Sequence, residues 1–164
     1  MIIIVSHRGD NMILSMLDRY VILSVDRVRI EKLLKNAYLT NRRLARDLEK
    51  ELEIINASIN FLFQKIVEKI SKSSTEELIG LSKCLERKSL KVKSEMSETD
   101  TVLKMSENNK EVAESTKDEI AIKTYESIIE DTKDKRKEQQ EELNCYDGTL
   151  SLCYKMHFES KVTK

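Results

Sequence analysis

The sequence contains no proline, no tryptophan and only three glycines among its 164 residues. A globular domain of this length would carry about 8 prolines and about 11 glycines at average usage. Both residue types interrupt helices, because proline lacks a backbone donor and glycine loses much conformational entropy. Their scarcity predicts an all-α fold of long helices, in a coiled coil or an elongated helical bundle.

Large rings and long apolar runs are scarce as well. Three phenylalanines and five tyrosines favour narrow apolar seams over a broad core. The longest apolar stretch, residues 12–25, is interrupted by Asp18 and Arg19, and it falls short of the ~20 apolar residues of a membrane-spanning helix. We therefore expect no membrane insertion. With no signal peptide and an odd number of cysteines, an intracellular protein, cytoplasmic or nuclear, is expected.

The charges balance overall, with 29 basic and 29 acidic residues, but they are unevenly distributed. Residues 1–50 carry ten Lys and Arg against six Asp and Glu, and residues 111–142 carry six against eleven. We interpret these segments as two solvated helix faces. Arg42, Arg43 and Arg46 could form a basic cluster on one side of a helix, but the absence of aromatic platforms around them argues against a nucleic-acid partner.

The strongest pattern is a heptad seam. Apolar residues recur at alternating spacings of four and three, the period of a left-handed coiled coil. We expect this seam to be the partner interface, formed by Leu34, Tyr38, Asn41, Ala45, Leu48, Leu52, Ile55, Ile59, Leu62 and Ile66. Asn41 is its polar member. Two interpretations stay open: a buried Asn41 that fixes register, or an Asn41 that faces water at the rim.

A second set of apolar residues lies beside the seam. Its members are Leu33, Ala37, Leu44, Ile54, Phe61, Phe63, Val67 and Ile70. An apolar face of this width favours a bundle of three or more helices over a two-stranded rod. The expected partner is therefore another coiled-coil protein or further copies of this chain.

Four segments are expected along the chain. Residues 1–10 are a flexible start or a short strand, and residues 11–72 are the helical segment with the seam. Ser74 and Glu77 have the spacing of a capping box, so a new helix begins near Thr75. Residues 75–143 form this second, more polar helical segment. It either breaks near 106–109, in "SENNKE", or runs through as one helix.

The closing residues 144–164 differ from the rest. Asp147 and Gly148 form a turn dipeptide, after which apolar residues alternate up to Phe158. This pattern predicts a turn and a short C-terminal strand, with a disordered tail as the alternative.

Catalytic and metal-binding patterns are not found in the sequence. Its two histidines, His7 and His157, stand near opposite ends. Cys145, Cys153 and His157 lack a fourth ligand, and their spacing matches no common zinc pattern. Three glycines leave little room for a phosphate-binding loop. We expect a protein that is not an enzyme and holds no cofactor or metal.

A long charged helix followed by Tyr146, Leu150, Leu152 and Met156 resembles the short subunits of the four-subunit outer-kinetochore rod complex. In those subunits, a helical stalk precedes an aromatic residue and an L-x-L strand that opens an RWD-type head. The resemblance covers about 20 residues, and the head would be truncated or reduced here because the sequence ends at Lys164. It implies a stalk that pairs with a sister subunit and links the kinetochore to microtubule-binding subunits.

Two functions follow as expectations. The first is a non-enzymatic coiled-coil scaffold or adaptor subunit that assembles with a partner through helix–helix contacts. The alternative is a compact, monomeric helical-bundle regulator or effector that docks on a target protein.

Overall fold

The computed structural model describes residues 8–162, and residues 1–7 and 163–164 lie outside the described part. The expected flexible start or strand therefore falls mostly outside it, and Arg8 already begins a helix. The described chain is an all-α bundle, as the sequence predicts. Its four helices are α1 (Arg8–Thr40), α2 (Arg42–Ser71), α3 (Thr75–Thr116) and α4 (Glu119–Val162).

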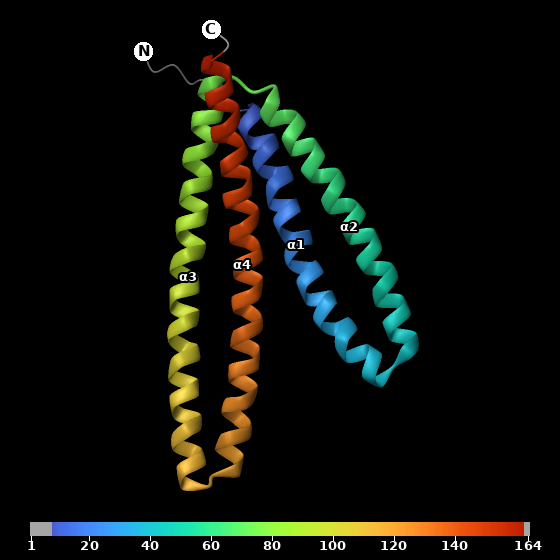
Figure 1. Ribbon diagram of the computed structural model, residues 1–164, viewed down its shortest axis with the longest axis vertical. Helices are drawn as coiled ribbons and strands as arrows, with labels where there is room; N and C mark the ends of the chain where they lie inside the picture. The colour runs from blue at the N-terminus through green and yellow to red at the C-terminus, as the bar shows by residue number, and fades with distance from the viewer. Residues whose placement is uncertain (1–7, 163–164) are drawn as a thin grey trace.

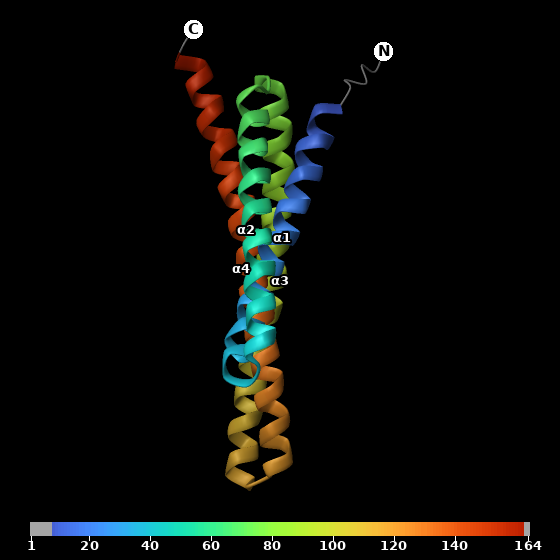
Figure 2. The ribbon, with the colours of Figure 1, turned by 90° about the vertical axis from the view of Figure 1, so that its right-hand side faces the viewer.

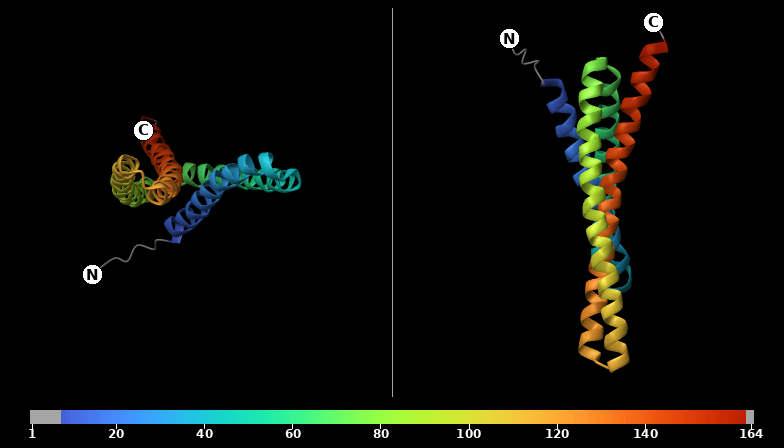
Figure 3. Two further views of the ribbon diagram at one scale, coloured as in Figure 1. Left: turned by 90° about the horizontal axis from the view of Figure 1, so that it is seen from below. Right: turned by 90° about the vertical axis from the view of Figure 1, so that its left-hand side faces the viewer.

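The helices form two antiparallel hairpins, α1–α2 and α3–α4 (Figure 1). They follow one another across the molecule in the order α3, α4, α1 and α2. The hairpins meet at the end where α2 passes into α3, and they diverge toward their tips. At the meeting end, the start of α1 and the end of α4 splay to opposite sides (Figure 2). The view along the molecule shows the two tips well apart (Figure 3).

A shared apolar core holds the meeting ends together. It draws buried side chains from all four helices, including Leu17 on α1, Ile66 on α2, Leu85 on α3 and Cys153 on α4, and each of these four is 0% exposed. Burying an aliphatic side chain of this size contributes about 1.5–3 kcal/mol. A separate, smaller cluster of Ile30, Ala37, Ala45, Leu48, Ile55 and Ile59 closes the α1–α2 hairpin farther out.

The predicted helical segment over residues 11–72 is helical but consists of two helices, because the chain divides at Asn41. The Asn41 side chain accepts hydrogen bonds from the backbone N–H groups of Arg43 and Leu44, both at 3.1 Å, and so caps the start of α2. Asparagine is among the best N-cap residues, because its short side chain satisfies donors that the first turn leaves unpaired. Asn41 is exposed at the hairpin tip, so it occupies no buried seam position.

The predicted helix start near Thr75 is confirmed. Ser74 Oγ accepts from the backbone N–H of Glu77 at 3.3 Å, and the Ser74 N–H donates to the Glu77 carboxylate at 2.7 Å. A single helix over residues 75–143 is not formed, since α3 ends at Thr116 and α4 begins at Glu119. The alternative, a break near 106–109, is not formed either, because α3 runs through that stretch. Ser106 is buried within that stretch, and packing outweighs the weak helix propensity of its neighbours.

Residues 144–162 belong to α4, which continues to Val162, so neither the predicted turn and strand nor the alternative of a disordered tail is found there. Leu143, Tyr146, Leu150 and Cys153 are spaced by three, four and three residues, which places them on one helix face. That face packs into the shared core. Gly148 is exposed on the opposite side of the helix, where it does not interrupt the packing.

Candidate helix-docking face

Most of the predicted seam closes the α1–α2 hairpin inside the chain. Ala45, Leu48, Ile55, Ile59 and Ile66 are buried, Leu34, Leu52 and Leu62 are half-buried, and Tyr38 and Asn41 are exposed. The buried members from Ala45 to Ile59 pack with Ile30 and Ala37 of α1. The buried seam residues are therefore covered by other residues of the same chain. A partner could reach them only if α1 and α2 separated.

The flank of α2 beside the seam carries a different set of exposed residues. Ile54 and Phe61 are 67% and 60% exposed, and a spacing of seven residues places them on the same helix face. The α2 outer face, as we call it, consists of Asp47, Lys50, Glu51, Ile54, Ala57, Ser58, Phe61, Lys65, Glu68 and Lys69. All of these are exposed except Ser58, which is half-buried.

A groove borders the outer face where α2 lies against α1. Arg19 and Leu23 of α1 line one wall, and the other is formed by Ala57, Ser58, Phe61 and Leu62 of α2. The groove encloses about 400 Å³. Ala57 and Ser58 are too small to fill the space beside Phe61. The Lys65 ammonium lies 5.9 Å from the Phe61 ring centroid, within the range of a cation–π contact. The groove thus has an apolar floor and a charged rim.

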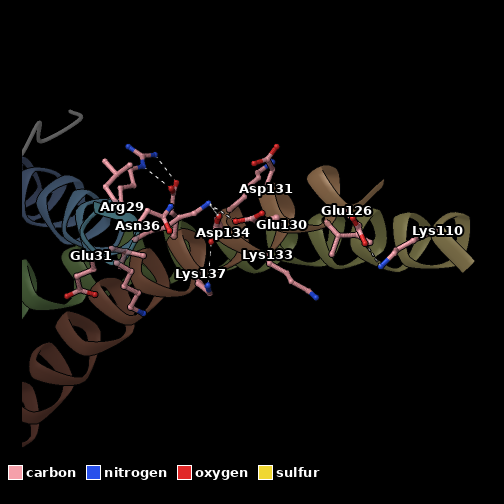
Figure 4. A pocket seen from close by; sticks show the side chains of 17 residues that line it. Arg29, Glu31, Asn36, Lys110, Glu126, Glu130, Asp131, Lys133, Asp134 and Lys137 are labelled. Carbon is pink, nitrogen blue, oxygen red and sulfur yellow. Dashed lines mark hydrogen bonds and ion pairs between the residues drawn. The ribbon is translucent and has the colours of Figure 1, made fainter. Parts of the chain in front are cut away.

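A second, polar cleft of about 980 Å³ separates the two hairpins (Figure 4). Arg29 of α1 pairs with Glu138 of α4 at 2.8 Å, and Lys32 pairs with Asp134. The hydrogen bond from Lys32 is the main cause that lowers the pKa of Asp134 below its ordinary value. Part of the basic early segment and part of the acidic late segment therefore face each other across this cleft, whereas Arg42, Arg43 and Arg46 stay exposed, as the interpretation as solvated helix faces expects.

The cysteines are poorly placed for chemistry. Cys145 and Cys153 are buried free thiols, and burial raises the pKa of Cys153 to about 11. A thiol with such a pKa is almost entirely protonated at neutral pH and is a weak nucleophile. Within residues 8–162, no group of three or more His, Cys, Asp and Glu side chains is placed to hold a metal ion. No helix in the same part of the chain is long and apolar enough to cross a membrane.

No family model matches the chain, and comparison with curated proteins and with solved structures likewise gives no match. The residues that resemble the kinetochore subunits are helical here. Tyr146 is buried in the shared core, with Leu150, Leu152 and Met156 packed against it, so the L-x-L strand is not formed.

Sequence reasoning placed Ile54 and Phe61 beside the seam but missed that they form a separate face. Their spacing of seven residues was the available signal. The small residues between them and the charges beyond them carry no apolar periodicity, so only the structure brings them together with α1.

Proposed function

We propose that this chain is a non-enzymatic helical adaptor that binds a helical partner through the α2 outer face. The observation that carries the proposal is the pair Ile54 and Phe61, exposed on one face of α2, with Phe61 lining the groove shared by α1 and α2. Scattered exposed apolar residues are normal on protein surfaces, but an apolar pair beside a groove matches the way amphipathic helices are recognised.

The thinness of the α1–α2 hairpin supports this assignment. Beyond the shared core its seam consists of one row of buried side chains. Leu48, Ile55 and Ile59 in this row are still 7–9% exposed. Helices draw most of their stability from tertiary packing, so a two-helix ribbon gains from an additional helix. Burial of Ile54 and Phe61 under that helix contributes about 1.5–3 kcal/mol each.

The alternative function, a compact monomeric regulator, is favoured by the shared core. That core takes buried residues from all four helices, so the chain needs no partner to cover its strongest apolar positions. In both functions a target would dock on an exposed face. They differ in whether the chain works as part of a stable assembly or as a free monomer. A place in the outer-kinetochore rod complex and an intracellular location both stay predictions.

The test is affinity capture from the source cell with three tagged variants. Ile54→Glu and Phe61→Glu place a charge on the outer face, and Leu90→Glu places the same charge at an exposed leucine of α3, 66% exposed. We expect proteins captured by the wild type and by Leu90→Glu to be lost with both α2 variants. Photo-crosslinking from position 54 then identifies the bound segment. Identical captured sets for all four chains would contradict the proposal.

Ile59→Asp is a poorer test of partner binding. Ile59 is 7% exposed and packs against α1, so a carboxylate there disrupts the hairpin whether or not a partner exists. Circular dichroism of the exposed-face variants should instead match the wild type, because neither Ile54 nor Phe61 contributes to a buried cluster.

A further inference from the structure

A row of ion pairs joins α1 to α4 outward of the shared core. Every base in this row belongs to α1 and every acid to α4. Going from the shared core toward the tips, the pairs are Arg27 with Glu141 at 2.5 Å, Arg29 with Glu138 at 2.8 Å, Lys32 with Asp134, and Lys32 with Glu130 at 3.6 Å. We call this row the α1–α4 ladder. Its register is that of two antiparallel helices, because each step outward along α1 is matched by a step back along α4.

The ladder is the main contact between the hairpins in this region. The shared core reaches along α4 only as far as Leu143, and the second apolar cluster contains residues of α1 and α2 alone. The cleft beside the ladder is lined mostly by charged side chains (Figure 4). Separation of the hairpins here would therefore uncover no buried apolar cluster among the described residues.

The pairs become more exposed toward the tips. Arg27 and Glu141, the innermost pair, keep 31% and 20% of their side chains exposed, whereas Lys32 and Glu130 at the outer end keep 41% and 71%. Salt screens exposed charges more strongly than partly buried ones. The outer pairs should therefore separate first, and the ladder should open from the tips inward.

Members of the ladder have second partners on their own helices. Arg29 also pairs with Asp26 of α1 at 3.2 Å, and Asp134 with Lys137 of α4 at 3.4 Å. When α1 and α4 separate, these pairs remain and neither charge is left alone. Exposed ion pairs also contribute little net free energy, because ordering the side chains and screening by salt offset most of the attraction. The closed state is thus only weakly favoured.

Each hairpin has its own means of staying intact during such a movement. Ile30, Ile55 and Ile59 are buried between α1 and α2. Arg136 of α4 pairs with Asp100 of α3 at 2.8 Å on a side of α4 that does not line the cleft. The two hairpins can therefore move as rigid bodies, with the pivot at the shared core where α2 passes into α3.

From this arrangement we infer that the α1–α4 ladder is an electrostatic latch between two hairpins that swing about the shared core. With the ladder formed the tips are near each other, and with the ladder screened or broken they move apart. The inference goes beyond the proposed function, since it concerns a movement between the hairpins and involves no residue of the α2 outer face.

The test is the distance between the two hairpin tips in the full chain, measured by electron–electron double resonance. Spin labels are attached at Leu39→Cys, near the end of α1, and at Ile120→Cys, near the start of α4, in a Cys84→Ser background. Both positions are more than 80% exposed, and Cys145 and Cys153 are buried. Raising the salt from about 0.1 M to about 1 M shortens the Debye length from about 10 Å to about 3 Å. We expect the longer distances to gain population, while circular dichroism stays unchanged.

Charge reversal tests the latch without a change of salt. Arg29→Glu replaces an attraction to Glu138 by a repulsion, so the ratio of open to closed chains should rise about five- to tenfold at about 0.1 M salt. The double variant Arg29→Glu/Glu138→Arg should return the distances toward those of the wild type. Arg136→Gln is the matched control. It removes an ion pair of equal length from α4, but within one hairpin, and should leave the tip distances unchanged.

Three outcomes would overturn the latch: tip distances that do not respond to salt, a double variant as open as Arg29→Glu, or an Arg136→Gln variant that opens as far as Arg29→Glu. The proposed function is tested separately, because Ile54 and Phe61 lie outside the ladder. Loss of captured proteins in Ile54→Glu would support the adaptor function even if the hairpins prove rigid.

Discussion

Beyond the shared core, the α1–α2 hairpin is closed by aliphatic side chains, whereas the α3–α4 hairpin is closed mostly by small or polar ones. Ile30, Leu48, Ile55 and Ile59 are buried between α1 and α2. The corresponding buried residues of α3 and α4 are Thr99, Ser106, Ala113, Thr132 and Gln139.

Hydrogen bonds and ion pairs between the paired helices are more numerous in the α3–α4 hairpin than in the α1–α2 hairpin. Ser89 donates to Asp147 at 2.8 Å, Arg136 pairs with Asp100 at 2.8 Å and Lys110 pairs with Glu126 at 3.0 Å, all between α3 and α4. Between α1 and α2, the hydrogen bond from Tyr38 to Glu49 is the one such link among the described side chains, those of residues 12–159.

The contrast shows two ways of closing a helical hairpin. Small seam residues let α3 and α4 approach closely, and hydrogen bonds and ion pairs then fix their register without a large apolar surface. Aliphatic seam residues hold α1 and α2 mainly by burial. Ile54 and Phe61 lie beside this seam and stay exposed, and Phe61 borders the groove between α1 and α2.

The largest effect should come from the core that both hairpins share. Leu85→Ala removes a side chain that is 0% exposed, and it should lower the free energy of unfolding by about 2–5 kcal/mol. The melting temperature, followed by circular dichroism, should fall by roughly 10 °C at this chain length. Leu90→Ala, an exposed position one and a half turns away, should stay within about 0.5 kcal/mol of the wild type. Equal melting of the two variants would show that the hairpins do not depend on this core.

A smaller effect should be confined to the α1–α2 hairpin and show whether the two hairpins unfold independently. Ile59→Ala should cost about 2 kcal/mol through its cavity between α1 and α2. Amide hydrogen exchange should quicken in the outer half of that hairpin and stay unchanged in α3 and α4. Ile54→Ala on the same helix is the matched control, and at dilute concentration it should leave exchange unaltered because Ile54 is exposed. Faster exchange throughout the chain would mean that the two hairpins unfold as one unit.

The sequence predicted the helical class and the seam because both rest on local rules. Missing prolines and alternating spacings of four and three act within one helix, and so does the capping box at Ser74. Local rules could not predict which helix covers the seam. Apolar periodicity states that a face is buried, but it does not state whether the covering helix belongs to the same chain.

In the closing segment, local rules could not decide between a strand and a helix. Leu150, Leu152, Tyr154 and Met156 alternate as in a strand, while Leu143, Tyr146, Leu150 and Cys153 recur as in a helix. Both patterns are present, and the shared core selects the helical one by burying Tyr146 and Cys153. The outer face was visible only as two apolar residues, since its groove depends on Arg19 and Leu23 of another helix.

Substitution of Asn41 tests whether this residue acts as a helix cap or as a buried seam residue. The expected loss of stability is smaller than that of either core variant. Asn41→Ala removes the acceptor for two backbone N–H groups and should cost about 1 kcal/mol. A buried seam asparagine would respond differently, because an apolar replacement there raises stability and alters oligomeric state. Denaturant unfolding and sedimentation of Asn41→Ala and Asn41→Asp decide between them. We expect the aspartate variant to retain the cap, and a gain in stability for the alanine variant would overturn it.

The smallest effect concerns the charges between the hairpins. The hydrogen bond from Lys32 holds the pKa of Asp134 below its ordinary value of 3.8, with Lys137 as a lesser contributor. Because the folded pKa lies below the unfolded one, this contribution to stability is present above the unfolded pKa and disappears as the pH falls through the folded pKa. Carboxyl NMR should therefore place the Asp134 midpoint below 3.8, and Lys32→Gln should raise it more than Lys137→Gln does. An unchanged midpoint in Lys32→Gln would mean that α4 alone perturbs Asp134, and that acid does not loosen the contact between the two hairpins.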